Sequence, residues 1–189
     1  MKLKRLCYWL KKEPAPVVEK KNCPCYDLNG NFIGWFSRSV AVVTFAFCRN
    51  EREEWCILGS ERGKDAADYQ GYWNAPCGFL DFNETTKQAA IRETLEETGV
   101  QLTEGDLTCI GFQDDPEKSN NQNVTFRYVA IINDKMTSDF SFSHERNEGD
   151  EVGEIKWIPL DKIGLYKWAF GHGDLITEII KFLKINNLN

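Results

Sequence analysis

The sequence predicts an α+β fold in which helices cover a mixed β-sheet. Strand-like runs of β-branched and aromatic residues mix with helical spacings, without the strict strand–helix–strand alternation of a parallel sheet. The chain of 189 residues is also long enough for one sizeable core but short for two independent domains. We therefore expect one main domain, with any remaining chain packed on it as an extension.

The first part of the chain is expected to form such an extension and to end in a β-hairpin. Prolines interrupt the first 22 residues, which show no clear period. Residues 25–28 and 31–36 read as two strands around Asn29-Gly30, a pair that supplies the positive φ angles of a two-residue turn. The expected division is therefore an extension over residues 1–36 and a single domain over residues 37–189.

The main domain begins with a run that predicts a buried strand. Ser39 to Cys48 is a continuous β-branched and aromatic run, which is typical of a strand covered on both faces. Further strands are expected at residues 55–58, 107–112, 124–132 and 154–158. Apolar residues at helical spacing predict a closing helix at 173–184. Polar loops separate these elements at 61–70, 113–122 and 137–150.

Another helix is marked by both of its ends. Thr85 and Gln88 fit a capping box, in which two side chains satisfy backbone N–H groups at the helix start. Gly99 stands where a left-handed residue would end the helix. We therefore expect a helix from Thr85 to Gly99.

This helix gathers three acidic side chains on one face. Glu93, Glu96 and Glu97 stand at positions i, i+3 and i+4, so their carboxylates project together. Like charges at this spacing destabilise an isolated helix, and Arg92 can offset only part of the repulsion. A solvated surface face would have interleaved lysine partners, which these glutamates lack. Because oxygen ligands suit Mg²⁺ or Mn²⁺, the cluster indicates a site for a hard divalent cation.

The stretch GFLDFNETTKQAAIRETLEETGV, residues 78–100, resembles the Nudix box, G-x5-E-x7-R-E-U-x-E-E-x-G-U, where U is a bulky aliphatic residue. Thr94 departs from the pattern at the first U position. The positions in register are Gly78, Glu84, Arg92, Glu93, Glu96, Glu97, Gly99 and Val100. The resemblance implies a Nudix hydrolase fold, an α/β/α sandwich with a mixed β-sheet and the box helix packed on it.

The resemblance also implies a chemistry. It predicts hydrolysis of a nucleoside diphosphate linked to another moiety, with Mg²⁺ (or Mn²⁺) held by the box glutamates Glu93, Glu96 and Glu97. Gly78 would permit the loop before the helix, while Arg92 and Glu84 would brace it. In the family, a glutamate from a later loop often joins the site. The catalytic carboxylates are accordingly expected to be Glu93, Glu97 and Glu151.

The choice of Glu151 rests on its position. Four glutamates in HERNEGDEVGEIKW are candidates, and Glu151 is favoured because its segment leads into the strand that carries Trp157. The alternative is that all four are solvated loop charges. The other three candidates are Glu145, Glu148 and Glu154.

Substrate contacts are expected outside the box as well. Arg62 follows a strand and could contact phosphate, although a plain surface arginine is nearly as good an interpretation. Arg127 could reach the substrate or pair with a glutamate, and Phe79 could stack on a base or belong to the core. Neither histidine, His144 nor His172, has a metal-ligand partner at useful spacing; the segment around His172 is expected to cap the last helix.

Composition argues against several classes of protein. A net charge of −6 provides no basic field for a nucleic acid polymer or an anionic membrane. No apolar run approaches the roughly 20 residues of a membrane span. Seven scattered cysteines do not resemble a disulfide framework, and the close pair Cys23 and Cys25 lacks the second pair that a zinc ribbon needs. A cytoplasmic protein is expected.

The substrate is less clearly marked than the reaction. The wording G-F-x-D after Cys77 is similar to that of NADH diphosphatases, and ADP-ribose or another nucleoside diphosphate sugar is an equal candidate. Alternatives are a (deoxy)nucleoside triphosphate or a non-catalytic, nucleotide-sensing Nudix domain. The identity of the substrate is expected to depend on the loops at 61–72, 113–122 and 137–150. Trp9, Trp35 and Phe36 of the extension could serve a homodimer interface or pack on their own domain.

Overall fold

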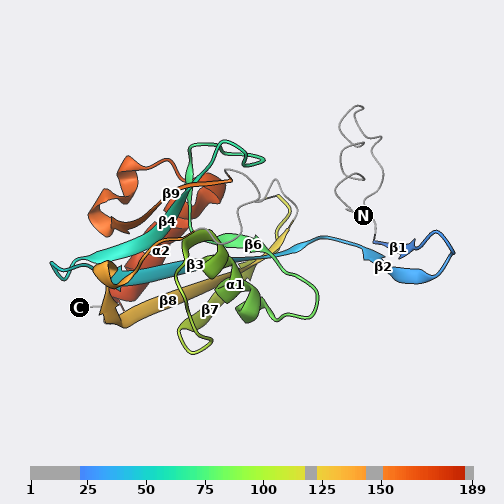
Figure 1. Ribbon diagram of the computed structural model, residues 1–189, viewed down its shortest axis with the longest axis horizontal. Helices are drawn as coiled ribbons and strands as arrows, with labels where there is room; N and C mark the ends of the chain where they lie inside the picture. Colours follow the sequence, from blue (N-terminus) through green and yellow to red (C-terminus); the bar gives the residue numbers. More distant parts are fainter. Residues whose placement is uncertain (1–21, 118–122, 144–150, 186–189) are drawn as a thin grey trace. The chain divides into compact units, whose positions relative to one another are not determined.

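The computed structural model of the chain describes residues 22–117, 123–143 and 151–185. The chain divides into two compact units, Met1–Arg38 and Ser39–Asn189. In its described part, the first unit is a two-stranded antiparallel hairpin of β1 (Cys23–Tyr26) and β2 (Phe32–Phe36) (Figure 1). A hairpin was expected here.

The turn of this hairpin differs from the expected two-residue turn. The N–H of Asp27 donates to the carbonyl of Asn31, at 2.8 Å, and the N–H of Gly30 donates to the carbonyl of Asp27, at 3.0 Å. The Asp27 carboxylate also accepts the backbone N–H groups of Asn29 and Asn31. Of Asn29 and Gly30, only Gly30 has a positive φ, +84°. The two-residue prediction was wrong because the Asp27 side chain organises a longer turn, Asp27–Asn31.

The second unit contains a seven-stranded mixed sheet with β3 at its centre. The strand order is β5-β4-β3-β8-β7, with β6 paired to β3 and β9 paired to β4. Only the pairing of β3 with β8 is parallel, and the other pairings in this sheet are antiparallel. The strands are β3 (Val40–Arg49), β4 (Trp55–Arg62), β5 (Trp73–Asn74), β6 (Cys77–Phe79), β7 (Leu107–Gln113), β8 (Val124–Met136) and β9 (Val152–Pro159).

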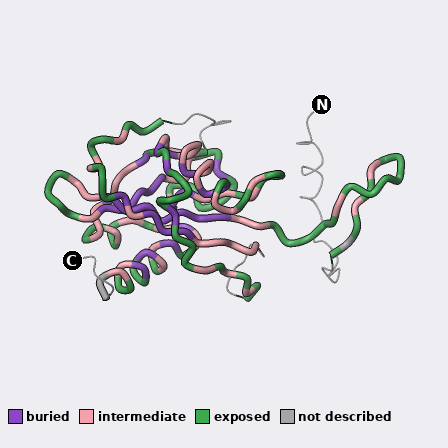
Figure 2. Tube along the Cα trace, turned by 90° about the horizontal axis from the view of Figure 1, so that it is seen from below, coloured by how far each residue is buried: buried purple, intermediate pink, exposed green. Residues whose placement is uncertain are grey.

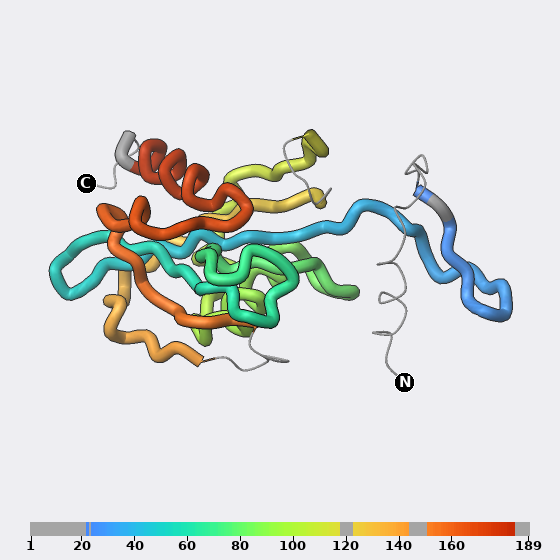
Figure 3. The backbone as a smooth tube through the Cα atoms, turned by 90° about the horizontal axis from the view of Figure 1, so that it is seen from above, coloured from blue at the N-terminus to red at the C-terminus, as the bar shows by residue number. Residues whose placement is uncertain are grey.

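Helices cover both faces of this sheet. Figure 3 shows α2 (His172–Ile185) on one side of the strands and α1 (Thr86–Thr98) on the other. Short 3₁₀ turns complete the unit: η3 (Thr137–Asp139), η4 (Leu160–Leu165) and η5 (Ala169–Gly171). The arrangement confirms the α/β/α sandwich.

The two helices pack on alternate residues of the central strand. Val42 and Ala46 of β3 lie in the core beneath α1, together with Ala90. Val43 and Phe45 lie in the core beneath α2. Because successive side chains of a strand point to opposite faces, one apolar run supplies both layers. Figure 2 shows this buried centre of the unit, and the expectation of a strand covered on both faces is confirmed.

The ends of α1 follow the predicted capping pattern. The N–H of Gln88 donates to the Thr85 hydroxyl, at 3.2 Å, and the N–H of Thr85 donates to the Gln88 side chain, at 2.8 Å. At the other end, Gly99 has φ +76° and donates its N–H to Leu95. Thr94, which departs from the box pattern, is fully buried and donates its hydroxyl to the carbonyl of Ala90, at 2.7 Å. A threonine is therefore accommodated without an unsatisfied polar group.

Several strands are longer than the sequence indicated. β4 runs to Arg62 because its last residues pair with β9, where Arg62 lies opposite Val152.

Among the described residues, the structure contains no helix with the length and apolar character of a membrane span. Among the described cysteines, Cys48, Cys56, Cys77 and Cys109 are free thiols.

Candidate functional site

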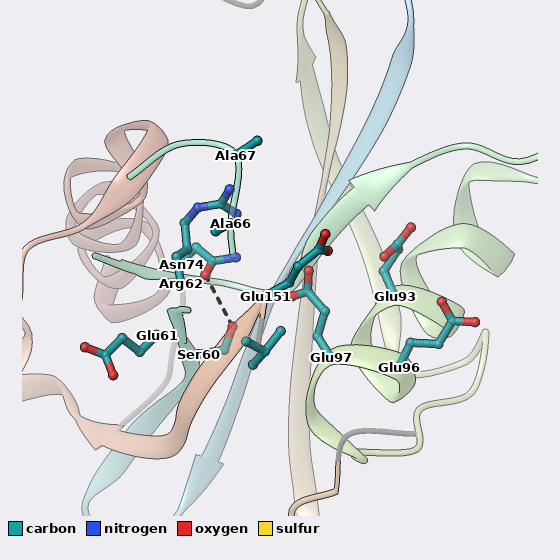
Figure 4. Close-up of a pocket in the computed structure, with 11 residues that line it drawn as sticks. Ser60, Glu61, Arg62, Ala66, Ala67, Asn74, Glu93, Glu96, Glu97 and Glu151 are labelled. Carbon is teal, nitrogen blue, oxygen red and sulfur yellow. Dashed lines mark hydrogen bonds between the residues drawn. The ribbon is translucent and has the colours of Figure 1, made fainter. Parts of the chain in front are cut away.

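A pocket of about 280 Å³ lies between α1 and the ends of β4 and β5 (Figure 4). Three glutamates of α1 stand on one side, while Glu151 comes from the segment just before β9. In Figure 4 the carboxylates of Glu97 and Glu151 lie side by side, and Glu61 points away from them. The lining residues are Ser60, Glu61, Arg62, Ala66, Ala67, Asn74, Glu93, Glu96, Glu97, Glu151 and Val152.

Arg92 holds the acidic face of α1 and the preceding loop together. Its Nε and Nη2 donate to the carboxylate of Glu84, at 3.0 and 2.7 Å, and Nη2 also donates to the carbonyl of Phe79. Its Nη1 donates to Glu93, at 2.7 Å, and to Glu96, at 3.3 Å. The hydrogen bonds from Arg92 lower the pKa of Glu84 below its usual value. One guanidinium thus orients two pocket carboxylates and fixes the loop beside them.

Gly78 lies directly against one of these carboxylates. A Cβ atom at this position would overlap the carboxylate of Glu93. Gly78 pairs with Val42 of β3, so its backbone cannot easily move away. Glycine at this position therefore leaves room for the Glu93 carboxylate beside β6, and a larger residue would displace that carboxylate.

Glu97 lies against the start of β6. Its Oε2 accepts the N–H of Cys77, at 3.3 Å. Burial raises the pKa of Glu97 to about 8, and the nearby charges of Glu93 and Glu151 add to the shift. Burial also raises the pKa of Glu93, against the effect of Arg92. An enclosed carboxylate among like charges is stabilised by a bound cation.

The donor set of the pocket fits a hard divalent cation. Glu93, Glu96, Glu97 and Glu151 offer only carboxylate oxygens, the ligand type that Mg²⁺ prefers. In the described part of the chain, no three acidic, histidine or cysteine side chains are yet close enough to enclose a metal ion. Glu93 and Glu96 are turned towards Arg92 instead. Their assignment as metal ligands stays a prediction.

A buried polar wall closes the pocket opposite α1. The Ser60 hydroxyl donates to Oδ1 of Asn74, at 3.3 Å, and Nδ2 of Asn74 donates to the carbonyl of Ala75, at 3.1 Å. Nδ2 also contacts the sulfur of Cys77, whose N–H in turn donates to Glu97. Sequence reasoning missed Ser60 and Asn74 as site residues, because they meet only through the pairing of β4 with β5.

Arg62 is the last residue of β4, rather than part of a loop after a strand, and it lines the pocket. Its expected contact with phosphate stays a prediction. Its Nε donates to the carbonyl of Asp68, at 2.9 Å, and its Nη2 to the carboxylate of Asp68, at 2.6 Å. Its guanidinium also lies 5.0 Å from the centre of the Phe170 ring. Arg62 is therefore held in place at the pocket wall by a loop residue and an aromatic ring.

Two other predicted substrate contacts do not line the pocket. Phe79 ends β6 with 57% of its surface exposed. Arg127 lies two residues before Val129, which packs in the core beneath α2, so both are on that face of the sheet. Burial lowers the pKa of Arg127, and the charge of Glu178 on α2 opposes the shift. A role of Phe79 or Arg127 with substrate stays a prediction.

The four glutamates considered around Glu151 differ in their position relative to the pocket. Glu151 lines the pocket, whereas Glu154 pairs with Lys156 at 2.6 Å and is exposed. Glu145 and Glu148 lie outside the described residues, as does His144.

His172 is buried where α2 begins. Its Nδ1 accepts the N–H of Ala75, at 3.1 Å, and burial lowers its pKa to about 3. The residue ties the start of α2 to the link between β5 and β6. The capping role expected for this segment stays a prediction.

Comparisons with known proteins agree with this architecture. The family model described as NUDIX domain matches residues 38–179. The NUDIX domain of Shewanella oneidensis NrtR, complexed with ADP ribose, superposes with a TM-score of 0.65 and 20% identity, over 84% of this chain and 94% of that one. A MutT/nudix family protein from Enterococcus faecalis gives 0.62 and 20%, over 97% and 70%.

A bifunctional NMN adenylyltransferase/ADP ribose pyrophosphatase from Francisella tularensis, complexed with AMP and a Mn ion, gives a TM-score of 0.59 and 24% identity. The match covers 77% of this chain and 42% of that protein. At such identities these likenesses show a shared fold.

Proposed function

Because the chain belongs to the Nudix family of pyrophosphohydrolases, we propose that it is a Mg²⁺-dependent hydrolase that cleaves the pyrophosphate bond of a nucleoside diphosphate linked to another moiety. The observation that carries the proposal is the pocket in which three glutamates of α1 face Arg62 and Glu151. An NADH- or ADP-ribose-like substrate is favoured, since a similar fold has been seen with ADP ribose and another with AMP.

The box glutamates Glu93, Glu96 and Glu97 would hold Mg²⁺, or Mn²⁺ in its place. When bound, the cation supplies neutralisation of the diphosphate and activation of the attacking water. Glu93 and Glu96 must leave Arg92 in part to take up this role, because Arg92 now donates to both.

Other residues of the pocket would contact the substrate or accept a proton from the attacking water. In the described part of the chain, Nη1 of Arg62 has no hydrogen-bond partner, while Nε and Nη2 are taken by Asp68. Nη1 is therefore the donor that would reach a phosphate oxygen from the wall opposite α1. Glu97 and Glu151, side by side, are the candidates to accept the proton of the attacking water. The leaving phosphate then departs with the other half of the substrate.

Two other functions would use the same pocket. A (deoxy)nucleoside triphosphate would present the same phosphate chemistry, and a non-catalytic domain would bind a nucleotide as a sensor. The like charges gathered around Glu97 and the filled acidic positions of the box favour catalysis, since a sensor needs neither.

A hydrolysis screen tests the proposal. NADH, ADP-ribose, nucleotide sugars, diadenosine polyphosphates and dNTPs are incubated with Mg²⁺, with Mn²⁺ and with a chelator, and products are identified by mass. We expect a nucleoside monophosphate among the products, no turnover with the chelator, and a loss of about a hundredfold or more in Glu97→Gln.

Glu104→Gln is the matched control, because Glu104 is exposed and lies outside the pocket. It should retain the activity of the wild type. Tight ADP-ribose binding without hydrolysis of any compound would favour the sensor and exclude the enzyme.

A further inference from the structure

An aromatic pair lies beside the pocket and has no part in the chemistry described so far. Tyr69 belongs to the loop that joins β4 to β5, and Phe170 belongs to η5. Their ring centres are 4.9 Å apart in an edge-to-face contact. Residues distant in sequence are thus brought together next to the site.

Both members of the pair have unusual backbone conformations. Tyr69 has φ +49° and Phe170 has φ +56°, in the left-handed region that bulky residues rarely adopt. Such conformations persist only where the surrounding structure enforces them, and they cluster at ligand sites. Two of them meet here in one contact.

The loop that carries Tyr69 is tied to itself. Nε2 of Gln70 donates to the carbonyls of Lys64, at 2.7 Å, and Ala66, at 3.0 Å. The N–H of Tyr72 donates to the carbonyl of Tyr69, at 3.0 Å, and the two rings are 5.5 Å apart. Tyr69 is therefore presented by an ordered loop, as a preorganised contact requires.

The pair adjoins the pocket through Arg62 and the same loop. The guanidinium of Arg62 lies over the Phe170 ring, at 5.0 Å, and also lines the pocket. Ala66 and Ala67 of the Tyr69 loop line it as well. Tyr69 remains 43% exposed, so part of its ring is open to a ligand.

A purely structural role explains the pair less well. The start of α2 is already fixed, because His172 accepts the N–H of Ala75 and packs against the Phe45 ring. A half-exposed tyrosine adds little burial to that joint. The strained backbone of Tyr69, which the loop maintains in the free protein, points to a ligand contact rather than to this joint.

We propose that Tyr69, supported by Phe170 and Arg62, is a specificity-determining residue that stacks on the nucleobase of the substrate. The inference rests on the proposed function, which sets the diphosphate between Arg62 and α1, so that the attached nucleoside continues past Arg62 towards Tyr69. Every base has a π-face, so Tyr69 would select compounds with a base over plain sugar phosphates.

Product binding tests the inference without requiring turnover. Titration calorimetry with Mg²⁺ compares AMP, which carries a base, with ribose 5-phosphate, which does not. We expect Tyr69→Ala to weaken AMP binding roughly ten- to a hundredfold, the loss typical of one base–aromatic stack, and to leave ribose 5-phosphate unchanged. Tyr69→Phe should bind AMP like the wild type, and Tyr69→Leu should behave like the alanine variant.

Phe182→Ala is the control, since Phe182 is an exposed aromatic residue near the other end of α2. It should change neither affinity. An equal loss for AMP and ribose 5-phosphate, or no loss in Tyr69→Leu, overturns the inference. If the protein binds AMP in a base-selective way but hydrolyses no substrate, the proposed enzyme is refuted and the role of Tyr69 is not. If it hydrolyses a substrate and Tyr69→Leu leaves that hydrolysis unchanged, the role of Tyr69 is refuted and the enzyme is not.

Discussion

His172 is a buried imidazole whose neutral form is built into the fold. Its Nδ1 accepts a backbone N–H, which requires that this nitrogen carry no proton. Burial lowers its pKa to about 3 from a usual value of 6.5, and the charges of Arg127 and Arg62 act in the same direction. A single residue at the joint between α2 and the sheet therefore couples stability to pH.

Acid should therefore destabilise the protein through His172. Below pH 6.5 the unfolded chain binds a proton at His172 and the folded chain does not, so the free energy of unfolding falls as pH falls. Between about pH 8 and about pH 5 the loss from this residue should be about 2 kcal/mol. Urea unfolding at a series of pH values measures it.

The comparison variant is His172→Asn, which keeps a hydrogen-bond acceptor but does not titrate. It should be less stable than the wild type at pH 8 and lose about 2 kcal/mol less on acidification. The raised pKa of Glu97 has the opposite sign, but it is common to both proteins and cancels in the difference. Parallel pH profiles for the two proteins would show that His172 is not the titrating group.

Some residue roles in the site could be predicted from the sequence, and others could not. The bracing role of Arg92 could be expected, because box spacing fixes its position relative to Glu84 and Glu93. Gly78 was expected to permit a loop, but it lies in β6 beside the Glu93 carboxylate. The meeting of Tyr69 with Phe170 could not be expected, because no local pattern links a loop between strands to a turn before the last helix. Contacts of that kind depend on the whole fold.

At the level of elements, the end of α1 depends on one glycine. Gly99 combines φ +76° with close packing, and a Cβ atom there would come within 2.7 Å of the backbone nitrogen of Ser143. We predict that Gly99→Ala lowers the free energy of unfolding by about 1–3 kcal/mol, through backbone strain and the forced shift of that neighbour. Chemical denaturation monitored by circular dichroism gives the value.

Gly105→Ala is a matched control for this helix end. Gly105 is exposed, has no positive φ, and the nearest atom to an added Cβ would be the Thr103 hydroxyl, at 3.7 Å. Its effect should stay within about 0.5 kcal/mol. Similar losses in both variants would mean that α1 ends by some other means.

Elements were predictable where the determinants are local. The caps of α1 lie within a few residues of the helix, and they were foreseen from Thr85, Gln88 and Gly99. The turn after β1 was not, because the Asp27 side chain competes with the expected Asn-Gly turn. β4 exceeded its predicted length because its last residues pair with β9, which is distant in sequence.

For the molecule as a whole, the proposed domain division can be tested by truncation. Both hydrophobic cores and every residue that lines the pocket lie after residue 38. We predict that residues 37–189 alone unfold cooperatively and retain hydrolysis, because one complete core is sufficient for a domain. Thermal unfolding and the substrate screen provide the readouts, and a chain that lacks a cooperative transition would refute the division.

The role of the extension can be tested with the same shortened chain. Trp35 and Phe36 expose 64% and 68% of their surface, and a two-stranded hairpin is marginally stable by itself in water. A homodimer through this extension stays a prediction. Sedimentation of the full and shortened chains at several concentrations would reveal a dimer that depends on residues 1–36.

The parallel ladder of β3 and β8 also bears on the time course of folding. Val40 lies opposite Val124, and the chain between them contains α1 and most of the sheet. Closing so long a loop costs entropy before any contact compensates it, so we expect the local hairpin of β3 and β4 and the helix α1 to form first. Glu151 reaches the other pocket residues only when β9 docks on β4. A nascent chain would therefore acquire its pocket late, after most of its secondary structure exists.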